Sequence, residues 1–252
     1  LNFDIKLQEG EITEVNNATS HQVRILDEKI KVLYIEGMPR WEYRYLRWVL
    51  LRDPRLQVQF LMTQGDPALA ASSPLHIGRF PEDPKEALKY DLIILGDVPA
   101  SFFNAGQTQL IERLVRERGG SLLMLAGPMA APSTYRDTPI GELLPVNIGT
   151  GGYLNLGINI SPEVTEDGHK SLATSLSLAP DVSARIWSHV KPMYGLPQLA
   201  GSKSGATVLL RLPKANEADA DYPLVAWHRY GTGKSLFVAT EDLWRMRLEV
   251  GD

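Results

Sequence analysis

The sequence contains no cysteine, and this absence removes several classes of chemistry. Disulfides, thiolate metal sites, Cys-x-x-Cys redox centres and a cysteine nucleophile are all excluded, because each needs the cysteine sulfur. No apolar run approaches the ~20 residues that a membrane-spanning helix needs. The 26 basic and 30 acidic residues give a net charge of −4, so the composition predicts no broad positive surface for nucleic acid or anionic lipid.

Metal and phosphate sites are not expected either. The five histidines are scattered, without the His-x-His or His-Glu-x-x-His spacing of metal ligands. The stretch 231–235 (GTGKS) is similar to the end of a phosphate-binding loop, but His228 stands where that loop needs its first glycine. The residues that follow predict a strand and not the helix that such a loop must open. We therefore predict a glycine-rich hairpin turn there, and no cofactor.

The 252 residues predict one large domain preceded by a short β segment. Residues 1–29 are expected to be β-structure: Phe3, Ile5 and Leu7 alternate with polar residues, as do Val23 and Ile25, and Asn16-Asn17 predicts a turn between the two runs. Because two strands alone are marginally stable, we expect this segment to complete a β-sandwich that lies mostly upstream. Residues 30–252 are expected to form the main domain, and the chain to be a piece of a longer protein.

From residue 30 onward, short apolar runs alternate with helical spacing. Strands are predicted at 31–37, 56–62, 91–97 and 121–126, helices at about 40–53 and 110–117, and a long surface loop at 67–84. This order predicts a doubly wound, mostly parallel α/β sheet. Residues 128–205 are rich in Gly, Pro and Ser, with weaker helical signals near 140–144 and 171–176 and a strand signal at 154–160. Antiparallel strands are predicted at 206–212, 223–230 and 234–240, and a solvated loop at 214–221.

Glycines and acids follow three of the predicted parallel strands, as Glu36-Gly37, Gly96-Asp97 and Gly127-Pro128. The carboxyl ends of parallel strands meet at one edge of a sheet, where such folds bind ligands. Glycine permits tight turns and close backbone approach at that edge. The acids either bind a ligand there or cap helices.

The predicted helix over 40–53 has two neighbouring stripes at i, i+4, i+7 spacing. One is aromatic (Trp41, Tyr45, Trp48) and the other is basic (Arg40, Arg44, Arg47). We expect the aromatic stripe to pack on the sheet or on the β segment. For Arg40 and Arg44 two interpretations stand side by side: they face the ligand crevice, or they pair with acids and extend along the surface.

Residues 32–47 read VLYIEGMPRWEYRYLR. This stretch resembles the opening of the class I glutamine amidotransferase-like domains of large bacterial membrane-anchored proteins, which often carry von Willebrand A-type modules. The resemblance continues through 90–99, 114–128, 203–210 and 229–247, where residues 241–245 read EDLWR. It implies a flavodoxin-like sheet, a location in the cell envelope, and other domains of the same longer chain, or a further protein, as partners. Membrane contact would come only from segments outside residues 1–252.

The resemblance implies the fold without the glutaminase activity. True amidotransferases place a cysteine on a sharp turn after a central strand and pair it with a His-Glu couple near the C-terminus. Here Gly127-Pro128-Met129 follows the strand without a cysteine, and no histidine stands near Glu241 and Asp242. Without a thiolate the reaction lacks its nucleophile, so we assign no catalytic residue. The candidate ligand pocket consists of Glu36, Gly37, Arg40, Arg44, Gly96, Asp97, Gly127, Asp242 and Arg245.

Three hypotheses follow. The first is a catalytically silent module that binds a ligand or partner, or supports neighbouring domains. The second is a hydrolase or transferase that uses Ser101, Ser133 or a carboxylate of Glu36, Asp97 or Asp242, although no serine has a Gly-x-Ser-x-Gly context. The third is a structural role in which the helix over 40–53 contacts a partner, and this hypothesis predicts an exposed aromatic patch.

Overall fold

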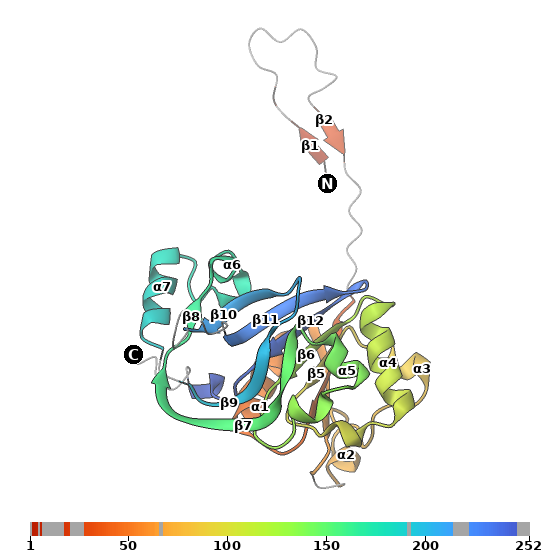
Figure 1. Cartoon of the computed structure of the whole chain (residues 1–252). Helices are drawn as coiled ribbons and strands as arrows, with labels where there is room; N and C mark the ends of the chain where they lie inside the picture. The colour runs from red at the N-terminus through yellow and green to blue at the C-terminus, as the bar shows by residue number, and fades with distance from the viewer. Residues whose placement is uncertain are drawn as a thin grey trace.

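The computed structural model describes residues 2–4, 6, 18–20, 28–65, 68–190, 193–213 and 222–245. An eight-stranded sheet in the order β4-β3-β5-β6-β12-β11-β10-β8 forms the centre of this part (Figure 1). The first five strands of that order pair in parallel. The remaining three continue the sheet in antiparallel pairing. The prediction of an α/β fold with a mostly parallel central sheet is confirmed.

The strands of the sheet are β3 (Ile30–Glu36), β4 (Leu56–Met62), β5 (Leu92–Leu95), β6 (Ser121–Leu125), β8 (Glu163–Val164), β10 (Thr207–Leu212), β11 (Tyr222–Tyr230) and β12 (Gly233–Val238). A second, two-stranded sheet pairs β7 (Val146–Ile160) with β9 (Met193–Ser202), and a third pairs β1 (Asn2–Asp4) with β2 (Ala18–Ser20). The predicted turn at Asn16-Asn17, the strand around Val23 and Ile25, and the loop at 214–221 lie outside the described residues.

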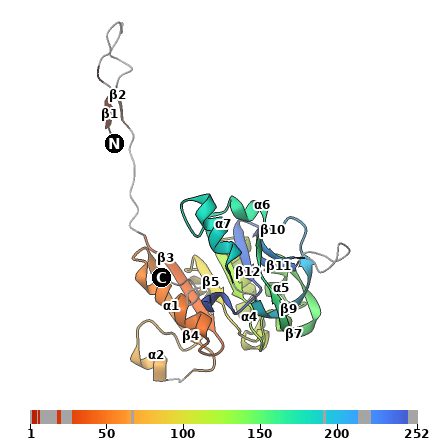
Figure 2. The same cartoon turned by 90° about the vertical axis from the view of Figure 1, so that its left-hand side faces the viewer.

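The helices are α1 (Trp41–Arg52), α2 (Ala68–Ser72), α3 (Pro84–Ala87), α4 (Ala105–Arg116), α5 (Pro139–Leu143), α6 (Glu166–His169) and α7 (Pro180–Ser188). Single 3-10 turns are η1 (Ala100–Phe102), η2 (Ser133–Tyr135) and η3 (Leu172–Thr174). Figure 2 shows α1 alongside β3 and β4. Within the described residues, no helix combines the length and the apolar character that crossing a bilayer requires.

Local signals explain the parallel half of the sheet. Residues Val32 to Glu36 of β3 are all buried, as expected for an apolar run covered on both faces. Helix α4 begins with a capping box between Asn104 and Gln107. Gly119 then has φ +84°, a left-handed conformation that ends the helix.

The stretch 231–235 forms the hairpin turn predicted from the sequence. Tyr230 pairs with Gly233 across β11 and β12, and Gly231 has φ +60°. Lys234 and Ser235 belong to β12. Because no helix starts there, this stretch lacks the geometry of a phosphate-binding loop.

The region predicted as a loop over 67–84 has more structure than expected. It contains α2 and the first residue of α3, and His76 forms an isolated parallel bridge with Phe60 of β4. The backbone of Ile77 donates to the carbonyl of Phe60 at 2.9 Å, and Phe60 donates to the carbonyl of Leu75 at 2.8 Å. This segment therefore lies along the outer side of β4 and brings His76 next to α1.

Candidate functional site

Glu36, the last residue of β3, has a fully buried carboxylate. Its Oε1 accepts hydrogen bonds from the backbone N–H groups of Gly37 at 3.0 Å and Asp97 at 2.9 Å. Its Oε2 accepts from the hydroxyl of Tyr34 at 3.0 Å. The guanidinium of Arg40 donates to both oxygens, at 3.3 Å and 3.2 Å. The bonding capacity of this carboxylate is used within the protein itself.

Arg40 joins three parts of the chain that are distant in the sequence. Besides Glu36, it donates from Nη1 to the carbonyl of Ala126, just after β6, at 2.9 Å. The same nitrogen lies 3.5 Å from Oε2 of Glu241. Arg40 therefore links the ends of β3 and β6 with the segment 241–245.

Asp97 follows β5 and is also buried. Its Oδ1 accepts from the backbone N–H groups of Ala130 at 2.7 Å and Ala131 at 2.8 Å, and its Oδ2 accepts from Met129 at 2.8 Å. These three residues belong to the turn after β6, and Met129 is part of the stretch 127–129 in which the resemblance implies a nucleophile. Asp97 acts as an anionic cap for that turn.

Gly37, Gly96 and Gly127, the glycines at the strand ends, are packed closely against Glu36 and Asp97. A Cβ atom on Gly37 would lie 2.1 Å from the backbone oxygen of Asp97, and one on Gly96 would lie 2.2 Å from Oε2 of Glu36. A Cβ atom on Gly127 would lie 2.4 Å from Cγ of Asp97. Glycine is required at these positions because the strand ends and the two acids approach too closely for a side chain.

Asp242 and Arg245 lie in the segment 241–245. Oδ2 of Asp242 accepts from the backbone N–H of Tyr194 at 2.7 Å. Nε of Arg245 lies 2.9 Å from Oδ1 of Asp242 without hydrogen-bond geometry, so this contact is an ion pair. Within the described residues, neither Asp242 nor Arg245 is bonded to Glu36 or Asp97, so they attach the C-terminal segment to β9.

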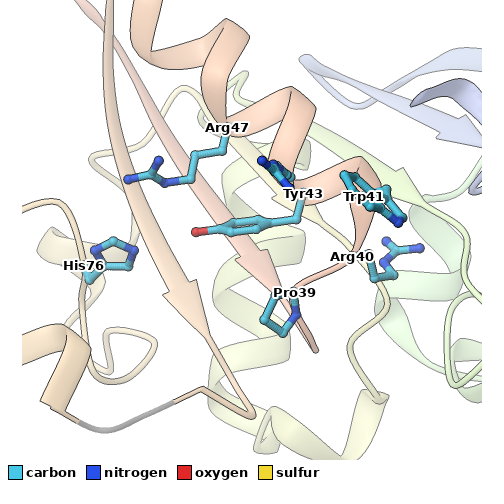
Figure 3. Close-up of a pocket in the computed structure, with 7 residues that line it drawn as sticks. Pro39, Arg40, Trp41, Tyr43, Arg47 and His76 are labelled. Carbon is cyan, nitrogen blue, oxygen red and sulfur yellow. The ribbon is translucent and has the colours of Figure 1, made fainter. Parts of the chain in front are cut away.

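A cavity of about 690 Å³ lies beside α1 (Figure 3). It is lined by Pro39, Arg40, Trp41, Tyr43, Arg44, Arg47 and His76. Only Arg40 and Arg44 of the predicted pocket residues are among them. Glu36, Asp97 and Asp242 do not line this cavity, and their carboxylates accept hydrogen bonds from backbone amides.

The aromatic stripe of α1 also differs from expectation. Trp41 is 50% exposed and Trp48 is 48% exposed, whereas Tyr43 and Leu50 are buried. The expected packing of the stripe on the sheet is therefore wrong. Trp41 stacks instead on Trp244 of the segment 241–245, with ring centroids 5.5 Å apart. The exposed aromatic patch of the third hypothesis is present on this helix.

Sequence reasoning missed Glu42, whose side chain is buried beneath the same C-terminal segment. Its Oε1 accepts from the backbone N–H of Trp244 at 3.3 Å. Burial raises the pKa of the Glu42 carboxyl to about 7, although the backbone hydrogen bonds from Trp244 and Leu243 oppose this shift. An acid in the first turn of a helix is ordinarily exposed and stabilises the helix through the helix dipole. No sequence signal therefore marked Glu42 as buried.

Replacing Glu42 with Gln is expected to make stability less dependent on pH. The native carboxyl binds its proton up to about pH 7, whereas the unfolded one releases it near 4.5. The free energy of unfolding therefore falls as pH rises through this window. Relative to the unmodified protein, E42Q is expected to be equally stable at pH 4.5 and more stable at pH 8, by about 1–3 kcal/mol.

Urea denaturation at the two pH values measures this difference. Glu166→Gln is the matched control, because Glu166 is an exposed helical residue. Equal effects of E42Q at both pH values would contradict the assigned burial of Glu42.

Comparison of the sequence with protein-family models and with curated proteins finds no match. Among solved structures, a β-galactosidase from Rahnella sp. R3 is similar at 16% identity and TM-score 0.46, over 88% of this chain and 30% of that one. A ThuA-like protein from Bacteroides uniformis is 13% identical with TM-score 0.46, over 88% and 86% of the two chains. An exo-β-1,4-mannosidase from Opitutaceae bacterium strain TAV5 is 16% identical with TM-score 0.43, over 88% and 33%.

This chain thus spans about a third of the two glycosidase chains. None of the three structures is described as a glutamine amidotransferase-like domain. Likeness at this level identifies neither an activity nor a substrate for this protein.

Proposed function

We propose that residues 30–252 form a catalytically silent, flavodoxin-like module of the class I glutamine amidotransferase-like type. Its role is to bind a ligand or partner, or to support neighbouring domains, in a larger membrane-anchored bacterial envelope protein. The observation that carries the proposal is the structural use of both strand-end acids. Glu36 is paired with Arg40, and Asp97 holds the turn after β6.

The chemistry of that turn supports a silent module. Acyl-transfer enzymes stabilise the developing oxyanion with free backbone N–H groups. Here the N–H groups of Met129, Ala130 and Ala131 already donate to the carboxylate of Asp97. A second negative charge at the same place would be repelled by this carboxylate.

The hydrolase alternative gains no support from the side chains described. Ser133 donates its hydroxyl hydrogen to the carbonyl of Ala130, and Nε2 of His228 contacts the carbonyl of Leu143 at 2.7 Å. The hydroxyl of Ser188 lies 3.2 Å from Nδ1 of His189, but this pair is exposed and joins chain neighbours. A catalytic serine needs a base that is itself oriented in a protected site.

Ammonia release from glutamine tests the proposal. The purified protein is expected to release no more ammonia than a heat-denatured sample, because it has no thiolate nucleophile. Turnover above that control would refute the proposal. The variant Asp97→Asn would then show whether the turn after β6 carries the activity.

A further inference from the structure

The cavity beside α1 carries positive charge that no carboxylate of the described residues neutralises. Within the described residues, Arg40 pairs with two carboxylates, whereas Arg44 and Arg47 pair with none. Cζ of Arg44 lies 5.1 Å from the centre of the Trp41 ring, and Cζ of Arg47 lies 5.3 Å from the centre of the Phe60 ring. Among the residues that the structure describes, no acidic side chain lines the cavity. Three guanidiniums thus line it, two of them without a carboxylate partner in the described part of the chain, on a protein whose net charge is −4.

Polar groups gather around the ring of Phe60, which is fully buried. The ring centroids of His76 and Tyr43 lie 5.6 Å and 5.9 Å from that of Phe60, close to the Arg47 guanidinium. Figure 3 shows the Tyr43 hydroxyl directed toward the side of the cavity that holds Arg47 and His76. A guanidinium, a phenol and an imidazole therefore converge on one end of the cavity, and each can donate a hydrogen bond.

His76 has unused bonding capacity at this end. Its Nδ1 is buried and forms no hydrogen bond within the described part of the chain. Burial and the neighbouring Arg47 lower the pKa of the imidazole. Buried polar atoms are nearly always hydrogen-bonded in native proteins, and an exception needs an explanation.

Apolar side chains also line the cavity, next to Arg40 and Arg44. Pro39 and the exposed indole of Trp41 line it. The volume falls in the range of ~300–1,000 Å³ that is common for small-molecule sites. The cavity therefore combines guanidinium groups with apolar and aromatic surface.

We infer that this cavity binds a small organic oxyanion, with its carboxylate or phosphate group on Arg44, Arg47 and Tyr43 and its apolar body beside Pro39 and Trp41. Guanidinium groups bind both oxyanions through paired hydrogen bonds. Two uncompensated guanidiniums favour a ligand with two negative charges. The inference rests on the proposed function, since it names the ligand class of the silent module.

Isothermal titration calorimetry with three aromatic probes tests the inference. Phenyl phosphate and phthalate carry the two oxyanion types, and benzyl alcohol is the neutral control. We expect saturable binding of at least one anion and none of the alcohol. The anion that binds with the higher affinity identifies which oxyanion type, carboxylate or phosphate, the cavity prefers.

Variants on α1 locate the site. Arg44→Gln and Arg47→Gln are each expected to weaken anion binding about tenfold or more, because each removes a charge-assisted contact. Arg52→Gln is the matched control: it removes the same charge from the same helix, but Arg52 lies over Trp48 and outside the cavity. The affinity of R52Q for the anion is expected to stay within about twofold of that of the unmodified protein. Arg47→Lys serves as a second variant in case R47Q folds poorly. It keeps the charge but lacks the paired donors, so it is also expected to weaken anion binding.

A second readout follows the histidine directly. Bound phenyl phosphate is expected to raise the pKa of the His76 imidazole in an NMR titration, because a nearby negative charge favours the protonated ring. Failure of both anions to bind, or equal weakening by R52Q, would overturn the inference. Either result would leave the proposed function standing, because that proposal is decided separately by ammonia release.

Discussion

Replacing Arg40 with Met is expected to lower the free energy of unfolding by about 3–5 kcal/mol. The substitution keeps most of the side-chain volume but leaves the carboxylate of Glu36 buried without its cation. It also removes the hydrogen bond to the carbonyl of Ala126 and the ion pair with Glu241. Urea denaturation followed by circular dichroism measures the loss.

Arg55→Met is the matched control for this prediction. Arg55 forms a 2.6 Å ion pair with Asp53, but the Arg55 side chain is 81% exposed. Exposed pairs contribute little, because water solvates both charges when the pair is broken. If R40M lowered the free energy of unfolding no more than R55M does, the pairing of Arg40 with Glu36 would not stabilise the strand ends.

Gly37→Ala is expected to lower the free energy of unfolding by about 3 kcal/mol or more, or to prevent folding. The added methyl would lie 2.1 Å from the backbone oxygen of Asp97, and this oxygen belongs to the main chain. A flexible side chain could rotate away, but here the ends of β3 and β5 must separate. Thermal and urea denaturation measure the effect.

Gly152→Ala tests whether the loss comes from that contact. A Cβ atom on Gly152 would meet nothing within 4 Å, and Gly152 is not among the glycines with positive φ. Such a substitution commonly stabilises by about 0.4–1 kcal/mol, because the unfolded chain loses freedom. Equal destabilisation by both substitutions would show that close packing at Gly37 is not the cause.

Much of the parallel sheet could be predicted because its signals are local. The strand predicted at 56–62 matches β4, and the runs at 31–37, 91–97 and 121–126 contain or nearly contain β3, β5 and β6. Each is a short apolar run that ends near a glycine or an acid. Such patterns need no knowledge of distant contacts.

The region 128–205 could not be predicted in the same way. Helix α7 starts with a proline at its first position, inside a stretch that otherwise indicates loops. The pairing of β7 with β9 has three register shifts, so it lacks the regular alternation that identifies a strand. These elements depend on tertiary contacts that override local propensity.

The place of the two acids could be predicted, but their role could not. Topology alone brings Glu36 and Asp97 to one edge of the sheet. Whether a carboxylate faces a ligand or a backbone amide depends on loops far away in the sequence, such as the turn at Ala130 that donates to Asp97. His76 lines the cavity only because its segment pairs with Phe60, and no sequence pattern signalled that bridge.

The prediction that the aromatic stripe packs on the sheet was wrong for a related reason. Helix α1 offers two faces with large apolar side chains, and the spacing of Trp41, Tyr45 and Trp48 does not say which one is buried. The sheet covers the face of Tyr43 and Leu50 instead. Which face is buried depends on the elements that pack against the helix, and helical periodicity alone does not identify them.

A double-mutant cycle between Glu36 and Arg40 tests most directly whether the strand-end acids serve the fold. The free energies of unfolding of the unmodified protein, Glu36→Gln, Arg40→Met and the double variant define the coupling energy. We expect a coupling of about 2 kcal/mol, with the double variant more stable than R40M alone, because it no longer buries an unpaired carboxylate. Additive losses, within ~0.5 kcal/mol, would show that the two side chains do not stabilise one another, and the structural role assigned to Glu36 would be wrong.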